Sequence, residues 1–260
     1  MTSGELTGTL LLSIHLELEL EDQDRQDEQR LDEMRTRLLG ITQAAEIPAT
    51  WAVADPTLSA ATESVLAAGI GHELAVLGDE AWLGPGCGRA RLSRELVRRF
   101  SAPRKAGIPV NTLVLRKLSQ VSDLDLLIQH GVKAISGPAT ADLASLHKTQ
   151  TPPLRFGIWQ PPAALRLPVA GKWWSPASWL LRQEIKRTIR KRSTLHLCID
   201  VPRLIATDAE SLDSIGAILR FAAAKRDAGQ LQIATVGQLA TQALHARAGI
   251  PTRSILRPAA

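Results

Sequence analysis

Tyrosine is absent from this 260-residue sequence, aromatic residues make up only 3% of it, and cysteine occurs twice. Cys87 and Cys198 lie far apart, and neither belongs to a Cys-x-x-Cys pair or to a cysteine–histidine finger. This spacing argues against a disulfide framework and a zinc finger, and it suits a reducing compartment. A surface that stacks sugar rings or nucleic-acid bases would depend on the tryptophans alone.

Long uninterrupted apolar runs are also missing. His15 and Glu17 break the first apolar run, and no basic segment precedes it, so the pattern is typical neither of a signal peptide nor of a membrane span. We therefore expect a cytoplasmic protein. With 45% hydrophobic and 22% charged residues, the composition is that of a folded chain. We expect a single domain over residues 1–248 and a loosely held tail at 249–260.

Charge is unevenly spread, although the net charge is only +5. Acidic residues are concentrated between positions 17 and 33, whereas RQEIKRTIRKR at 182–192 is strongly basic. We favour a solvated helix face for 182–192, because no nucleic-acid motif and no interleaved aromatic residues give a strong nucleic-acid signal. The alternative is a basic scaffold that binds polyanions through this helix, which predicts salt-sensitive association.

Apolar segments of strand type alternate with segments of helical periodicity. The strand-type segments are 9–20, 50–54, 72–77, 108–115, 132–136, 154–159, 194–201 and 231–236. This alternation predicts a mostly parallel sheet covered by helices. No Gly-x-Gly-x-x-Gly segment follows the first strand, which favours a (β/α) barrel over a dinucleotide-binding sheet.

The first strand-type segment contains LLSIHLELEL at 11–20, in which apolar and polar residues alternate strictly. His15 and Glu17 share one face, while Ile14 and Leu16 share the other. Strict alternation is the period of a strand whose two faces meet different environments. The polar face is either the solvated side of an edge strand or part of an active site.

Four segments, in this order, resemble the NodB-homology polysaccharide deacetylases. LSIHLELE is similar to the first strand of that family, ATWAVAD to its A-T-F-F strand, GIGHELAVLGDEAW to its G-H-E-I-x-x-H-x-x-x-H segment, and STLHLCID to a late L-H-P strand. LRLPVAGKWW resembles the segment that precedes this late strand. The likeness covers roughly residues 9–240 and implies a distorted (β/α) barrel, an α/β fold.

The resemblance also implies a set of catalytic positions. In the family, an aspartate base and a metal-binding carboxylate come from the first strand, two histidines complete the metal site, and an Arg-x-Pro segment orients the base. His15 falls at the base position and Glu17 at the metal carboxylate. The two histidine positions are Leu77 and Ala81, and no Arg-x-Pro occurs around 111–118. One carboxylate and one imidazole hold a cation weakly, so we expect no bound metal and no other cofactor.

The late catalytic acid of the family corresponds to His196, and the resemblance treats His72 and Glu73 as structural residues. His15 itself has three interpretations: a substitute base, a ligand of a displaced metal, or a partner of Glu17, of which we favour the last. Cys198 lies two residues after His196, on the same strand face, and a small buried hydrophobic residue is its simplest interpretation.

Whether the protein is an enzyme stays open at this point. We predict a deacetylase-like protein with a degenerate metal site that is non-hydrolytic and binds a carbohydrate-related ligand or a protein partner. The alternative is a divergent hydrolase that cleaves the C–N bond of an N-acetylated sugar with His15, Glu17 and His196. Trp82, Trp173 and Trp174 are the candidate ligand-binding residues, although tryptophans at a barrel rim often seal its end.

Overall fold

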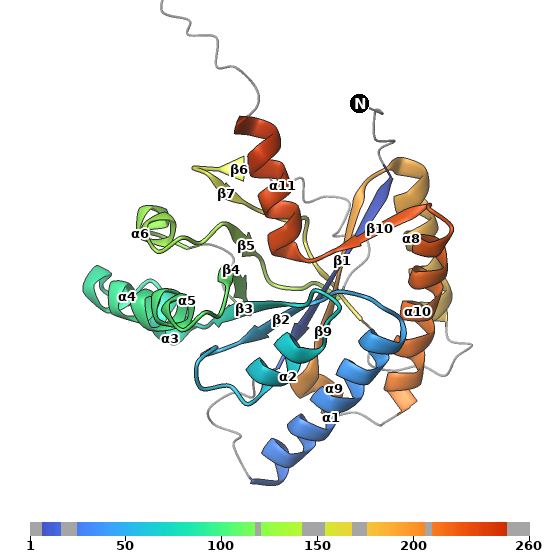
Figure 1. Ribbon diagram of the computed structural model, residues 1–260, viewed down its shortest axis with the longest axis horizontal. Coiled ribbons are helices and arrows are strands. Elements are labelled where there is room, and N and C mark those ends of the chain that lie inside the picture. The colour runs from blue at the N-terminus through green and yellow to red at the C-terminus, as the bar shows by residue number, and fades with distance from the viewer. Residues whose placement is uncertain are drawn as a thin grey trace, which may run out of the picture.

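The computed structural model describes residues 7–16, 25–117, 121–141, 154–167, 176–205 and 210–248 (Figure 1). These residues form one large β-sheet with helices packed against it. Within them, no helix is long and apolar enough to cross a membrane. The predicted tail at 249–260 lies outside the described residues.

The sheet is parallel apart from one short hairpin. Its strands are β1 (Gly8–His15), β2 (Thr50–Val53), β3 (Glu73–Gly78), β4 (Val110–Leu115), β5 (Ala134–Ser136), β6 (Leu154–Arg155), β7 (Ile158–Trp159), β8 (Leu165–Arg166), β9 (Thr194–Asp200) and β10 (Leu231–Ala234). They lie in the order β6-β7-β5-β4-β3-β2-β1-β9-β8, and β10 pairs with the first half of β1. All eight predicted strand-type segments therefore contain strands.

An isolated bridge joins the segment just after β5 to β8, the last strand of this order. Thr140, which follows β5, pairs with Leu165 in β8. The backbone N–H of Thr140 donates to the Ala164 carbonyl at 2.8 Å, and the N–H of Arg166 donates to the Thr140 carbonyl at 2.7 Å. The sheet therefore curls into a distorted barrel, which confirms the predicted (β/α) architecture.

Helices pack around this sheet. They are α1 (Arg25–Ala44), α2 (Ala61–Ala67), α3 (Glu80–Leu83), α4 (Arg89–Leu96), the π-helical turn η2 (Val97–Ser101), α5 (Ala102–Lys105), α6 (Leu124–Gln129), α8 (Pro176–Lys191), α9 (Val201–Ile205), α10 (Glu210–Asp227) and α11 (Val236–Ala248). In α10, the three- and four-residue spacing of Leu212, Ile215 and Leu219 places these side chains on one face, and all three are buried in the main core.

The alternation in β1 separates the outer core from the barrel interior. Leu12 and Ile14 belong to the large core beneath the helices, whereas Leu11, Ser13 and His15 face inward. Ser13 is fully buried and His15 is 4% exposed, because β1 lies between β2 and β9. The solvated edge-strand interpretation of these two residues is therefore wrong.

The segment 154–159 differs from the single strand that its apolar residues predict. It forms an antiparallel hairpin of β6 and β7, with positive φ at Phe156 (51°) and Gly157 (85°) in the turn. Two central residues with positive φ are typical of a tight two-residue hairpin turn. Strand β8 was not predicted, because two residues are too few to show a period.

Candidate functional site

His15 ends β1 on the inner face of the barrel, beside Cys198 of β9. The Cys198 Sγ atom lies 3.5 Å from Nε2 and 3.7 Å from Nδ1 of His15. Burial, followed by the charges of Arg116 and Arg166, lowers the pKa of His15 to about 3. The imidazole is therefore neutral near pH 7 and is a weak base.

Burial shifts the pKa of Cys198 in the opposite direction from that of His15. Its side chain is fully buried, and burial, followed by the negative charge of Asp200, raises the pKa of its thiol well above the usual value. A thiol that stays protonated is a poor nucleophile. The structure therefore agrees with a small buried residue at this position.

His196 lies on β9 and is buried inside the barrel. Its Nε2 atom is 2.7 Å from the Ser13 hydroxyl, and the residue is 1% exposed. Burial lowers its pKa to about 4, although the nearby Pro162 backbone acts in the opposite direction. His15 pairs in register with Asp200, four residues beyond His196, which separates the two histidine backbones by about 13 Å along the strand.

A charged group that the sequence did not predict surrounds the end of β9. The Asp200 Oδ2 atom lies 3.9 Å from Nε of Arg166 and 3.4 Å from Nε of Arg203. The Asp200 side chain is only 10% exposed. Asp200 Oδ1 and Arg166 Nε are both buried without a hydrogen-bond partner among the described residues. One acceptor and one donor that form no hydrogen bond with the described residues therefore lie close to His15.

A sequence signal for Arg166 exists. Residues 166–168 read Arg-Leu-Pro, which has the Arg-x-Pro spacing that was sought around 111–118. The Arg166 charge acts on His15, the position of the family's base, and its guanidinium also donates to the Ala139 carbonyl at 3.0 Å. The motif lies on β8, which pairs with β9, and not in the segment around β4 where the resemblance places it.

The two histidine positions of the family metal site hold side chains without lone pairs. Leu77 is 4% exposed and packs in an apolar cluster with Ala52, Ala75 and Val114. Ala81 lies in the short helix α3. In the part of the chain that the structure describes, no three His, Cys, Asp or Glu side chains form a group that could hold a metal ion. These residues do not fit the metal that the fold implies, and Glu17 lies outside the described residues.

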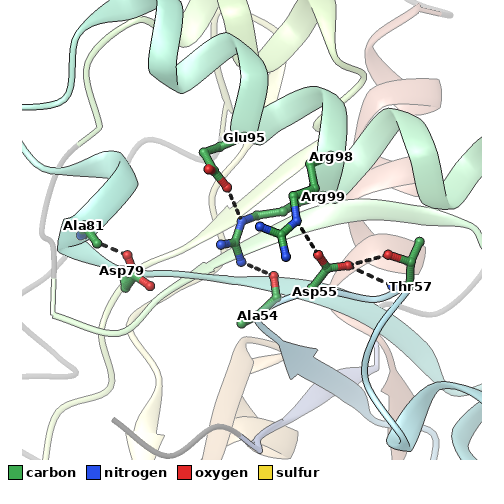
Figure 2. Close-up of polar contacts among 8 residues, drawn as sticks. All are labelled: Ala54, Asp55, Thr57, Asp79, Ala81, Glu95, Arg98 and Arg99. Atoms are coloured by element: carbon green, nitrogen blue, oxygen red, sulfur yellow. Dashed lines mark hydrogen bonds and ion pairs between the residues drawn. The ribbon is translucent and has the colours of Figure 1, made fainter. Parts of the chain in front are cut away.

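The acidic residues that follow β2 and β3 already accept hydrogen bonds from other groups of the protein (Figure 2). Asp55 accepts hydrogen bonds from the backbone N–H of Thr57 at 3.0 Å, from its hydroxyl at 2.6 Å, and from Arg98 Nε at 2.7 Å. Burial would raise the pKa of Asp55, but the Thr57 bonds and the Arg98 charge lower it overall. Asp79 caps α3 by accepting from the Ala81 backbone N–H at 2.9 Å.

The π-helical turn η2 supplies the arginines of this rim. Arg98 binds Asp55, while Arg99 donates from Nε to Glu95 at 3.0 Å and from a terminal nitrogen to the Ala54 carbonyl (Figure 2). Arg99 also lies over the ring of Trp82, 5.0 Å from its centroid. Trp82 is 2% exposed, so its ring is covered in this conformation. Trp173 and Trp174 lie outside the described residues.

The amino end of the barrel contains a second polar group, centred on Glu73. Its carboxylate accepts from the Thr50 hydroxyl at 3.0 Å, from the Thr112 hydroxyl, and from the Gly237 backbone N–H at 2.8 Å. Burial raises the pKa of this carboxyl group. Nearby, the Ala49 N–H donates to His72 Nδ1 at 3.0 Å. These contacts join β2, β3, β4 and α11, as expected of structural residues.

Comparison with known proteins adds information on the fold. No family model and no curated protein matches the sequence. The structure is similar to that of a candidate polysaccharide deacetylase from Mycobacterium smegmatis, with a TM-score of 0.66 and 16% identity, over 100% of this chain and 98% of that chain. It is also similar to a 4-alpha-glucanotransferase from Thermococcus litoralis, with a TM-score of 0.58 and 12% identity, over 91% of this chain and 40% of that chain. At such identities, the likeness establishes the fold: this chain is a distorted (β/α) barrel of the polysaccharide deacetylase type, as its motifs predict.

Proposed function

We propose that this chain is a non-hydrolytic protein on a polysaccharide deacetylase fold, and that it binds a carbohydrate-related ligand where β1, β8 and β9 end. The observation that carries the proposal is Leu77, which is buried among Ala52, Ala75 and Val114 at a position where the family has a metal-binding imidazole. A leucine in an apolar cluster offers no ligand to a cation.

Hydrolysis of an acetamide needs an activated water, and the described residues offer little to activate it. A bound divalent metal lowers the pKa of its water to about 7. His15, whose pKa is lowered to about 3 by burial, is a much weaker base than one matched to pH 7. Cys198 stays a thiol, because burial raises its pKa. The described residues therefore favour binding over bond cleavage.

The chemistry of the unpaired groups supports a ligand that carries hydroxyl groups. Asp200 Oδ1 can accept a hydrogen bond and Arg166 Nε can donate one, and both are buried without a partner among the described residues. A sugar hydroxyl both donates and accepts, so neighbouring hydroxyls of one ring can satisfy both atoms. The two similar structures carry the names of enzymes that act on a polysaccharide and on a glucan, which supports a saccharide by analogy of fold.

Metal analysis and an acetate-release assay on chitin oligosaccharides test the absence of hydrolysis. We expect no stoichiometric divalent metal in the purified protein and no acetate release when zinc, cobalt or manganese is added. Stoichiometric metal that is lost on Glu17→Ala, together with chelator-sensitive acetate release, would instead establish the divergent hydrolase.

Calorimetric titration with chitin and chitosan oligosaccharides tests ligand binding. We expect saturable binding to at least one of these probes, weakened about tenfold or more by Asp200→Ala. The matched control is Asp227→Ala, because Asp227 is an exposed residue of α10 that lies outside this group. Equal weakening by both variants, or binding of neither sugar series, would contradict the proposed site.

A further inference from the structure

A basic hollow of about 490 Å³ lies where the strands of the sheet begin, at the opposite end of β1 from His15. Lys186 and Arg190 of α8, Arg192 just after α8, and Lys225 in the last turn of α10 line it. Figure 1 shows α8 and α10 side by side, both ending near the starts of β1 and β10. No carboxylate belongs to its lining among the described residues.

The nearest acidic residues of these helices are engaged with other arginines. Glu184 lies 3.2 Å from Arg187, and Asp227 lies 2.8 Å from Arg226. The Lys225 ammonium donates to the neutral amide oxygen of Gln230 at 3.1 Å and lies 5.8 Å from the centroid of the Phe221 ring, and it forms no ion pair with a carboxylate of the described residues. The hollow therefore keeps the full positive charge of its four basic side chains within the described part of the chain.

Helix dipoles compensate only part of this charge. Both α8 and α10 end here, and each helix C-terminus carries roughly −0.5 elementary charge. The two ends together supply about −1, whereas the four side chains supply four positive charges. An excess of about three positive charges therefore remains, and helix capping alone does not explain it.

The backbone conformation of Arg192 is a second indication that the positive charge of this hollow has a role beyond helix capping. Its φ is 51°, in the left-handed region, at the point where α8 ends. The Ser193 N–H donates to the Thr188 carbonyl at 3.1 Å and closes the helix. Glycine is the usual residue at such a position, because a Cβ atom is strained there. An arginine here adds a cation to the hollow at a conformational cost.

We propose that this basic hollow binds a small anion that carries two or more phosphate groups. Arginine pairs with phosphate oxygens through parallel N–H donors, and lysine acts on them as a point charge. A single phosphate group carries at most about two negative charges, which is less than the excess of about three. A volume of about 490 Å³ lies within the range of small-molecule sites.

Calorimetric titration with sodium tripolyphosphate tests the proposal. We expect saturable one-to-one binding that weakens as salt is added. The double variant Lys186→Gln/Arg190→Gln should weaken it about tenfold or more. Arg192→Gly should also weaken it while leaving thermal stability unchanged or higher, because glycine relieves the left-handed backbone. This second variant separates loss of binding from loss of folding.

The matched control is Arg94→Gln/Lys105→Gln, which removes the same charge from exposed residues of α4 and α5. It should leave the affinity within about twofold. Equal weakening by the control, or no saturation, would overturn the proposal in favour of general charge attraction. Orthophosphate binding as tight as tripolyphosphate would refute the requirement for two phosphates. Oligonucleotide affinity that keeps growing with strand length would replace the small anion by a nucleic acid.

Discussion

A buried neutral histidine should make this fold sensitive to acid. His196 is 1% exposed, and its pKa is lowered from 6.5 to about 4, chiefly by burial. The unfolded chain therefore takes up a proton near pH 6.5, whereas the folded chain resists it down to about pH 4. Its contribution to stability is complete above pH 6.5 and is lost as the pH falls toward 4.

The size of this effect follows from the two pKa values. Each pH unit between them costs about 1.4 kcal/mol, so the free energy of unfolding should fall by about 2 kcal/mol between pH 7 and pH 5 because of His196 alone. That is a large share of the 5–15 kcal/mol that stabilises an ordinary domain. His15 contributes with the same sign, because its pKa is also lowered.

Urea unfolding at pH 7 and pH 5 isolates the contribution of His196. The variant His196→Gln should lose about 2 kcal/mol less than the unmodified protein over this interval, whatever its stability at pH 7. The same substitution at the exposed His245 of α11 leaves the buried histidine in place, so that variant should keep the His196 contribution to the loss. Parallel losses in the unmodified protein and in His196→Gln would refute a buried, neutral His196.

Three further substitutions test the polar groups at the two ends of the barrel. Gly237→Ala should lower the free energy of unfolding by about 2–3 kcal/mol, because the new Cβ would lie 2.8 Å from Glu73 Cδ. The control Gly40→Ala has open space around its Cβ and should raise the free energy of unfolding by up to about 1 kcal/mol. Urea unfolding compares the two variants. A carboxyl group with a raised pKa stabilises the fold only while it is protonated, so Glu73→Gln should gain stability relative to the unmodified protein as the pH rises above 4.5. Unfolding curves at a series of pH values measure this. Free energies of unfolding that stay parallel for the two proteins would contradict it. Arg99→Ala should expose Trp82 and shift its fluorescence to longer wavelength, and an unchanged spectrum would mean that other groups cover the ring.

Much of the fold could be predicted because its signals are local. Strand alternation and helical spacing are properties of neighbouring residues, so the positions of β1, β2, β3 and β9 and the parallel architecture follow from them. The hairpin at 154–159 and the bridge between Thr140 and Leu165 depend on turn geometry and on residues distant in sequence. No periodicity marks either feature.

The candidate site was harder to predict than the fold. Sequence placed His15 and His196 on inner strand faces, and both are buried there. The strand face of a residue follows from the alternation, but its position along the barrel axis does not. His196 lies beside Ser13 because of the register of β1 against β9. Arg166 and Asp200 come together for the same reason, since β8 pairs with β9 only in the folded chain. Motif spacing contains no information on such register.

The contacts of the described carboxylates at the ends of β2, β3 and β9 support the proposal of recognition rather than catalysis. A cation at this edge of the sheet would need oxygen atoms with free lone pairs. Asp55 is instead bound by Thr57 and Arg98, and Asp79 caps α3. Asp200, at the end of β9, keeps one oxygen without a hydrogen-bond partner among the described residues, but Arg166 and Arg203 lie beside its other oxygen and repel a metal ion. A neutral hydroxyl group meets no such repulsion and can still pair with that free oxygen, so the same electrostatics that disfavour a metal centre favour a sugar.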